Sequence, residues 1–361
     1  MKQSLHLAIA LLPILLLVTG CPLGPDPGPQ TYTVITGVYA IDGGTESTPA
    51  MLSAINYENK TLTQNIFEDQ NGKTLGGRVP DAISFGSHLC LCAHDAGTVY
   101  ITDLAGKIEH EITAGGTGAP YKPGHIIRHK QYLFVTYSEG YLARIDTTTY
   151  GVSLLEVGAN PQGLAVSNEK VYVACPGADG TGTTVTVVDA PSFSLFRNLT
   201  VTPNPSEVLA CGKNFLYVLY KGSGLDAAPS IEMFTTKQDE KLSTIPVASP
   251  LTMAAGPGVY SYVFVLTREM DDSGVVRQRI VPVDGISGRP ITDDFNQGEL
   301  VLETAVTISV DPVNGAVFVG STRTDGSGVY EVLNVNGSLW HTFNTTGTPG
   351  KVFFSTAQVE Y

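Results

Sequence analysis

The sequence predicts an all-β fold, a seven-bladed β-propeller, and three observations lead to this prediction. Only 15% of the 361 residues are charged while 39 are glycine, a composition that suits short strands joined by tight turns. A proline followed by an apolar segment recurs along the chain about every 40 to 45 residues, which is the period of propeller blades. The last such segment stands alone at the C-terminus, as expected of a strand that closes a ring.

Each repeat unit contains four segments with strand character. The first follows a proline and two variable residues, and these prolines are Pro80, Pro123, Pro161, Pro205, Pro250 and Pro349. One unit, near Thr304, lacks its proline. The second segment is aromatic and aliphatic, as in residues 216–220; the third ends in Asp, as in residues 143–146; a fourth follows, as in residues 153–157. Four strands in about 40 to 45 residues predict one blade.

The number of units predicts how the ring closes. Residues 79–348 supply six complete units, whereas residues 32–67 supply only three strands, at 32–41, 51–57 and 61–67. The isolated segment 349–355 is therefore expected to complete the first blade, which would leave no unpaired strand edge. Two separate sandwiches are the alternative. No Gly/Ser/Pro-rich linker follows residue 31, which favours a single propeller domain over residues 32–361.

The N-terminal residues predict a lipid anchor. A basic start at Lys2 is followed by an apolar stretch over residues 5–18 and by small residues before Cys21, which is the layout of a bacterial signal peptide. Cys21 at the cleavage position predicts a lipoprotein signal over residues 1–20 and lipid attachment to Cys21. A soluble exported protein is the alternative. The Pro/Gly-rich residues 21–31 are predicted to form a semi-rigid tether.

Charge and cysteine content narrow the function classes. The net charge of −13 argues against nucleic-acid binding and against flat adsorption on anionic lipid. Cys90 and Cys92 share one face of a predicted strand and are expected to be buried, whereas pairing of Cys175 with Cys211 stays open. The spacing of Cys and His does not suit a zinc site, and hydrolase and nucleotide-binding motifs are missing from the sequence. We therefore expect no enzyme, no metal and no cofactor.

Several motifs carry a family resemblance. Residues 160–166 (NPQGLAV), 170–174 (KVYVA) and 185–189 (VTVVD) resemble the repeats of YncE-like seven-bladed propellers. The chain also resembles propeller lipoproteins on the surface of Bacteroidetes, on four further segments: 71–76 (NGKTLG), 100–107 (YITDLAGK), 139–147 (EGYLARIDT) and 308–315 (ISVDPVNG). One class of these lipoproteins captures cobalamin and related corrinoids for an outer-membrane transporter. The resemblance therefore implies an outer-membrane lipoprotein that is exposed at the cell surface.

The predicted binding site lies at one mouth of the central channel. In a propeller, the residues after each repeat proline converge there, and here they are Asp81, His125, Gln162, Glu207, Thr252 and Lys351. The loops between second and third strands extend the same face, and functional loops on a rigid scaffold tend to be long. Aromatic and cationic side chains complete the predicted set: Arg78, His94, Tyr121, Tyr137, Tyr220, Arg268 and Arg323. A solvated mouth without a ligand, and simple packing of each tyrosine, are the alternatives.

Taken together, these features predict a lipid-anchored binding protein that captures a small nutrient, best guessed as cobalamin or another corrinoid. The predicted partners are this ligand, a TonB-dependent transporter and the membrane, which the protein contacts through its lipid alone. A metal-dependent hydrolase such as a lactonase, or a protein-docking lipoprotein, is the alternative. Catalysis would need several converging acids, Asn or His around a metal, whereas binding needs hydrogen-bonding and aromatic breadth. The mixed charges of the predicted ring favour binding.

Overall fold

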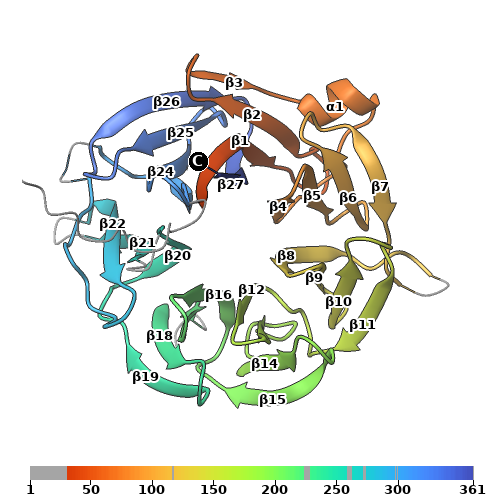
Figure 1. The fold of residues 1–361 in the computed structure, drawn as a ribbon. Coiled ribbons are helices and arrows are strands. Elements are labelled where there is room, and N and C mark those ends of the chain that lie inside the picture. Colours follow the sequence, from red (N-terminus) through yellow and green to blue (C-terminus); the bar gives the residue numbers. More distant parts are fainter. Residues whose placement is uncertain are drawn as a thin grey trace, which may run out of the picture.

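Short aromatic and β-branched segments form the strands that the repeat predicts, and these strands assemble into seven blades around a central axis (Figure 1). The computed structural model describes residues 31–360 except 116–117, 223–227, 258–261, 271–273, 297 and 299. The predicted signal peptide, Cys21 and the tether up to residue 30 lie outside the described residues. In the part of the chain that is described, no helix is long and apolar enough to cross a membrane.

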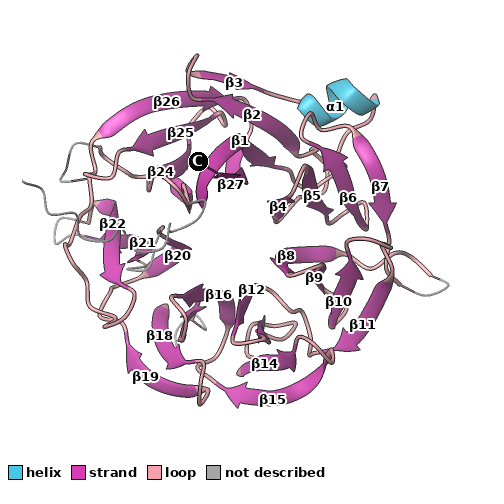
Figure 2. Ribbon diagram, viewed as in Figure 1, coloured by secondary structure: helices cyan, strands magenta, loops and turns pink. Residues whose placement is uncertain are grey.

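Each blade is an antiparallel sheet whose strands follow one another from the central axis outward, and Figure 2 shows that strands dominate the fold. The closing blade, which joins the two ends of the chain, consists of β27 (Thr348–Glu360), β1 (Thr31–Gly43), β2 (Met51–Asn56) and β3 (Thr61–Thr63). The second blade consists of β4 (Ala82–Phe85), β5 (His88–Ala93), β6 (Thr98–Asp103) and β7 (Ile108–Ile112). The third consists of β8 (Pro123–His129), β9 (Tyr132–Tyr137), β10 (Tyr141–Asp146) and β11 (Val152–Glu156). The fourth blade consists of β12 (Leu164–Ser167), β13 (Lys170–Cys175), β14 (Thr184–Asp189) and β15 (Ser194–Thr200), and the fifth consists of β16 (Pro205–Cys211), β17 (Phe215–Tyr220), β18 (Ser230–Thr235) and β19 (Glu240–Thr244). The sixth blade consists of β20 (Pro250–Ala255), β21 (Tyr262–Met270) and β22 (Val276–Asp284). The last blade consists of β23 (Ala305–Val310), β24 (Val317–Thr322), β25 (Gly328–Leu333) and β26 (Leu339–Thr345).

The Asp that ends the third strand of a unit forms a tight turn. Asp103 Oδ1 accepts hydrogen bonds from the backbone N–H groups of Ala105 and Lys107, both at 2.9 Å. Asp146 Oδ1 accepts in the same way from Thr148 and Thr149. An Asp side chain that bonds to the backbone ahead of it stabilises a turn. The repeated Asp is therefore a structural feature of the blade.

Apolar side chains pack between neighbouring blades, and seven clusters of buried residues fill the seven junctions. The four described cysteines are buried and form no disulfide. The predicted burial of Cys90 and Cys92 is confirmed, because both are fully buried on β5. Cys175 and Cys211 belong to different clusters and do not pair.

The C-terminal strand closes the ring as predicted. β27 is the innermost strand of the blade that β1, β2 and β3 complete. It is longer than predicted, because it pairs with β1 from Thr348 opposite Gly43 to Glu360 opposite Thr31. Gly350 lies so close to β1 that a Cβ atom would sit 2.4 Å from the Ile41 carbonyl oxygen. This junction therefore needs glycine at position 350.

Two details differ from the predicted blades. The predicted strand over residues 61–67 ends at Thr63, and the short helix α1 (Ile66–Asn71) follows. The Asn71 amide nitrogen donates to the carbonyl oxygens of Phe67 and Gly106, and Phe67 is 1% exposed, so this segment is bound to the neighbouring blade. In the blade that begins at Pro250, three strands are described. Two isolated bridges, Gln278–Leu302 and Val283–Pro290, lie along its outer edge.

Candidate functional site

The segments predicted to share one face meet within single blades. In several blades, the end of the second strand, or the turn after it, bonds to the segment that leads into the innermost strand of the same blade. His94 N donates to Arg78 O at 2.9 Å, and Ser138 N donates to Lys122 O at 3.1 Å. Equivalent bonds join Lys221 to Asn204, Arg268 to Ser249 and Thr322 to Thr304. These bonds define one end of the propeller, here called the entry face. The innermost strands begin at this end, at or just after the repeat prolines.

The centre of the entry face contains a buried carboxylate, Asp81, paired with Lys351. The Lys351 ammonium lies 2.6 Å from Asp81 Oδ1, and the side chains are 40% and 8% exposed. His125 Nδ1 lies 3.6 Å from Asp81 Oδ2. Burial by itself would raise the pKa of Asp81, but the charges of Lys351 and His125 outweigh it and hold that pKa well below its ordinary value. Residues from three inner strands or their starts thus meet at one point.

Glu207 supplies a second carboxylate on the inner strand β16. Its Oε2 accepts hydrogen bonds from the Thr252 hydroxyl and from Met253 N, both at 3.1 Å. Burial raises the pKa of Glu207, and the charges of His125 and Lys221 oppose that rise. His125 therefore acts electrostatically on both Asp81 and Glu207. The sequence prediction that these residues converge is consistent with this geometry.

Both carboxylates also connect neighbouring blades. Asp81 Oδ2 accepts from Ile126 N of β8 at 3.0 Å, and Glu207 reaches β20 through Met253. Asp81 Oδ1 accepts additionally from Ala82 N at 2.8 Å. Backbone donors hold each carboxylate in one orientation, while Lys351 and His125 stay partly exposed beside them. The arrangement presents cationic and hydrogen-bonding groups on rigid supports.

Four other predicted residues lie close to the starts of inner strands and have defined partners. Arg78 binds Asp95 through two nitrogens, Nε at 3.0 Å and Nη2 at 2.6 Å. His94 Nδ1 lies 3.0 Å from the Pro123 carbonyl oxygen. The remaining two pairings are Gln162 Nε2 with Asn160 Oδ1 at 2.8 Å and the Tyr121 ring stacked on Tyr141 with centroids 5.2 Å apart.

Two predicted aromatic contacts are not available to a ligand, because the rings of Tyr137 and Tyr220 are fully buried. Tyr220 donates its hydroxyl proton to Glu232 Oε2 at 2.8 Å. Tyr137 packs between two blades, and its hydroxyl has no hydrogen-bond partner among the described residues. Both are the last residues of second strands, β9 and β17, where the neighbouring blade covers them. The alternative interpretation, that these tyrosines simply pack in the core, therefore fits their positions.

The two predicted arginines are exposed. Arg323 donates from Nη2 to Asn344 Oδ1 at 2.8 Å, and Asn344 belongs to the outermost strand β26. Arg268 lies in strand β21, opposite Gln278, so the predicted loop over residues 268–274 begins later than expected. No contact joins either arginine to Asp81 or Lys351 in the described part of the chain. Their roles in binding stay predictions.

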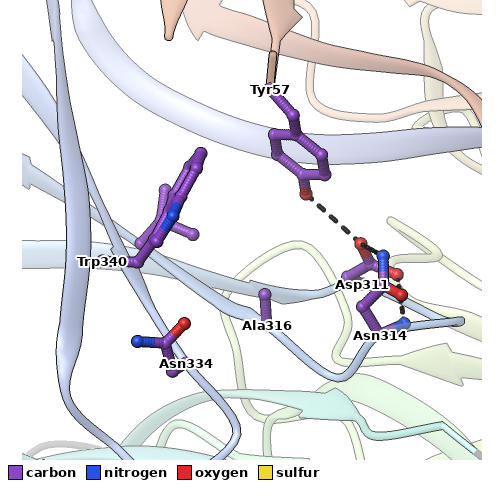
Figure 3. Close-up of a pocket in the computed structure, with 7 residues that line it drawn as sticks. Tyr57, Asp311, Asn314, Ala316, Asn334 and Trp340 are labelled. Carbon is purple, nitrogen blue, oxygen red and sulfur yellow. Dashed lines mark hydrogen bonds between the residues drawn. The ribbon is translucent and has the colours of Figure 1, made fainter.

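The opposite end of the propeller contains a cavity that the sequence did not indicate (Figure 3). Its volume is about 160 Å³, and it lies between the last blade and the closing blade. The lining residues are Tyr57, Asp311, Asn314, Ala316, Val332, Asn334 and Trp340. Sequence patterns place Tyr57 and Asp311 at opposite ends of the chain, so only ring closure brings them together.

Across the described ranges, no group of three or more His, Cys, Asp or Glu side chains is arranged to hold a metal ion. At the entry face, Asp81 and Glu207 are each occupied by donors from the protein itself. The geometry there is that of a polar cluster made of acids, a lysine and a histidine.

The chain is similar to known proteins in its architecture. No protein-family model matches the chain, and no curated protein matches it in sequence. It is similar in structure to a putative 6-phosphogluconolactonase from Bacteroides uniformis, with a TM-score of 0.62, 13% identity, and 88% of this chain and 99% of that chain covered. It is also similar to a quinonprotein alcohol dehydrogenase-like protein from Bacteroides thetaiotaomicron, with a TM-score of 0.58, 15% identity, and coverage of 90% and 79%.

A third similar structure is apo AztD from Citrobacter koseri, with a TM-score of 0.50, 12% identity, and 91% of this chain and 99% of that chain covered. These similarities concern the fold. At identities this low, one propeller architecture serves many unrelated functions. The seven-bladed propeller is confirmed, whereas the narrower resemblance to YncE-like and corrinoid-capturing proteins stays a prediction.

Proposed function

We propose that this chain is a small-molecule capture protein whose entry face binds a polar ligand, with a corrinoid as the sharpest candidate. The observation that carries the proposal is the cluster of Asp81, Lys351, His125 and Glu207 at the start of the inner strands. In this proposal the lipid on Cys21 anchors the protein at the outer membrane, exposed at the cell surface. A TonB-dependent transporter receives the ligand.

The chemistry of the cluster supports a ligand rich in hydrogen-bond acceptors. Lys351 is 40% exposed and His125 is 30% exposed, so both can meet a ligand while their acidic partner stays buried. Ligand sites combine a few well-oriented polar groups with a rigid scaffold. Corrinoids have many amide side chains, and cobalamins add a phosphodiester that a partly exposed lysine would attract. A small set of fixed donors around a channel mouth suits such a molecule.

The bonding of the two acids favours binding over hydrolysis. A hydrolase of the lactonase type would use acids that are free to bind a metal or a water molecule. Here Asp81 accepts from Lys351, Ala82 and Ile126, and Glu207 accepts from Thr252 and Met253. Groups so engaged orient their neighbours and stabilise the ring. We therefore prefer capture to catalysis.

The position of the N-terminal strand agrees with a tethered binding face. β1 starts at Thr31 and reaches the entry face only at Gly43, where it lies opposite Thr348. A tether that precedes residue 31 would leave from the other end of this blade. The entry face would then point away from the membrane, where it can meet ligands.

Calorimetric titration of residues 22–361 with cyanocobalamin and with cobinamide tests the proposal. We expect saturable heat with the unaltered chain. The double variant D81N/K351M removes both charges of the central pair and should weaken binding at least tenfold, about 1.4 kcal/mol. The matched control is K73M, because Lys73 is similarly exposed (43%) and pairs with Glu111 elsewhere on the surface.

The outcomes separate the alternatives. Absence of heat with both corrinoids would remove the corrinoid proposal. Binding that is equally strong in the unaltered chain and in D81N/K351M would move the ligand away from the entry-face cluster. Heat with a lipid-free fragment of a transporter and none with a small molecule would favour a protein-docking function.

A further inference from the structure

We propose that the cavity between the last blade and the closing blade binds a pyranose ring of a sugar. This site is separate from the entry face. It is formed by the turn between β23 and β24, the end of β25, strand β26 and the residue after β2 (Figure 3). In the figure, Trp340 lies on one side, Asp311 and Asn314 lie on the other, and Tyr57 points its hydroxyl toward Asp311.

One end of the cavity is polar and rigid. Asp311 is fully buried, and its Oδ1 accepts from the backbone N–H groups of Val313 and Asn314, both at 2.8 Å. Its Oδ2 accepts from the Asn314 amide at 3.2 Å and from the Tyr57 hydroxyl at 3.3 Å. Burial and the nearby Asp311 carboxylate raise the pKa of Tyr57, so Tyr57 stays a neutral hydrogen-bonding group. These bonds fix the side chains before any ligand arrives.

The other walls are aromatic and equally fixed. The rings of Tyr57 and Trp340 meet edge to face, with centroids 5.6 Å apart and planes at 80°. Tyr57 also stacks on Phe318 at 6.1 Å, and the Lys60 ammonium lies 5.2 Å from the Trp340 ring centroid. Aromatic rings offer large, rigid contact area, and these ring contacts fix the orientations of Tyr57 and Trp340. Ala316 and Val332 add small apolar contacts.

The volume fits a six-membered ring. An apolar cavity of about 150 Å³ in another protein accommodates benzene, and this cavity measures about 160 Å³. A second hollow of about 380 Å³ shares Asn314 and is lined mainly by apolar residues, among them Phe264 and Phe295. The two hollows are therefore neighbours at Asn314.

The combination of walls selects a sugar among small ring compounds. A pyranose has C–H faces that pack on aromatic rings and hydroxyl edges that bond to side-chain amides. A purely aromatic ligand would leave the amides of Asn314 and Asn334 facing an apolar surface, which is unfavourable. The Asp311 charge would repel an anionic ligand. A neutral polyhydroxylated ring satisfies both kinds of wall.

The chain offers a direct signal for this site, because Trp340 is its only tryptophan. We would titrate residues 22–361 with the methyl glycosides of glucose, galactose, mannose and N-acetylglucosamine and follow tryptophan fluorescence. A site for one small ring is expected to bind with a Kd of about 1 mM. At least one glycoside should change the fluorescence saturably, and calorimetry should give the same Kd.

Substitutions at the polar end test the assignment. N314A and N334A should each weaken binding at least fivefold, and thermal unfolding should show that both variants stay folded. N314A should lower the unfolding temperature slightly, because it removes the hydrogen bond from the Asn314 amide to the buried Asp311. N198A is the matched control, since Asn198 is an exposed amide on the outer strand β15, and it should bind as the unaltered chain does. D81N/K351M should also retain sugar binding, so this proposal and the proposed capture at the entry face can fail separately.

Three results would overturn the proposal. The first is that none of the glycosides changes the fluorescence or produces heat. The second is that indole or benzyl alcohol binds more tightly than every glycoside, which would make the cavity a site for aromatic compounds. The third is that N314A and N334A both bind as tightly as the unaltered chain. Should either variant unfold, W340F measured by calorimetry gives the same test from the aromatic wall.

Discussion

Replacing Lys351 by Met should destabilise the propeller by about 2 kcal/mol at pH 7. The substitution keeps most of the side-chain volume but leaves the Asp81 carboxylate, whose side chain is 8% exposed, without its ammonium partner at 2.6 Å. Breaking a buried ion pair by removing one partner typically costs about 3–5 kcal/mol. Because Lys351 is 40% exposed and water screens its charge, the lower value of about 2 kcal/mol is expected.

Urea unfolding followed by circular dichroism measures this effect. With a slope of about 3 kcal/mol/M, a loss of 2 kcal/mol lowers the unfolding midpoint by roughly 0.7 M. The matched control is K73M, which removes a lysine of similar exposure (43%) whose partner Glu111 is 49% exposed. Since exposed pairs contribute about 0–1 kcal/mol, K73M should have a much smaller effect. The double variant D81N/K351M should recover part of the loss, because no buried charge is left unpaired.

The pH dependence gives an independent check of the same pair. The native-state pKa of Asp81 lies below its ordinary value, with Lys351 as the main stabilising charge. The pair therefore contributes stability above the ordinary Asp pKa, near 3.9, and that contribution is lost as the pH falls through the native-state pKa. The difference in stability between the unaltered chain and K351M should shrink below about pH 4. If K351M matches the unaltered chain at pH 7, or if the difference is the same at pH 3, the reasoning is refuted.

Three further predictions concern ring closure, α1 and Glu207. G350A should cost about 1–3 kcal/mol in urea unfolding, because the new methyl group would lie in van der Waals overlap with the Ile41 carbonyl oxygen. The comparison is G118A, where a Cβ meets nothing within 4 Å and the backbone is not left-handed. Equal effects of the two substitutions would contradict the argument. F67A should cost about 3–5 kcal/mol, since Phe67 is 1% exposed and packs on Tyr100; a loss below about 1 kcal/mol would mean that α1 is not part of the core. The E207Q variant should become more stable relative to the unaltered chain as the pH rises from 4 toward 7. Burial raises the native-state pKa of Glu207, so ionisation of Glu207 destabilises the native state. A difference in urea midpoints that does not change with pH would contradict this prediction.

The repeat in the sequence predicted the blades well because its signals are local. A proline before an inner strand, an aromatic second strand and an Asp at the turn all act within one unit, and the structure shows the Asp turns directly, as at Asp103 and Asp146. Ring closure was also predictable, since a strand without partners must find the blade that lacks one. The Asp81 and Lys351 contact follows from that closure.

The parts that sequence reasoning missed depend on neighbouring blades. The middle strands are buried on both faces, so the local sequence is apolar on both sides of a tyrosine at the end of β9 or β17. This local pattern is the same for a packed tyrosine and for an exposed one. Tyr137 and Tyr220 are packed. α1 follows Thr63 because Asn71 and Phe67 bind the next blade. The cavity near Trp340 joins Tyr57 and Asp311, residues 254 positions apart, and no local pattern encodes that proximity.

The pairing of Thr31 with Glu360 sets the order in which the chain can fold. Until β27 has been synthesised, β1 has no inner partner, and its free N–H and C=O groups are open to pairing with other chains. Contacts between the two ends of a chain form slowly, because a long loop must close first. The insertion of β27 is therefore the step that covers the exposed edge of β1.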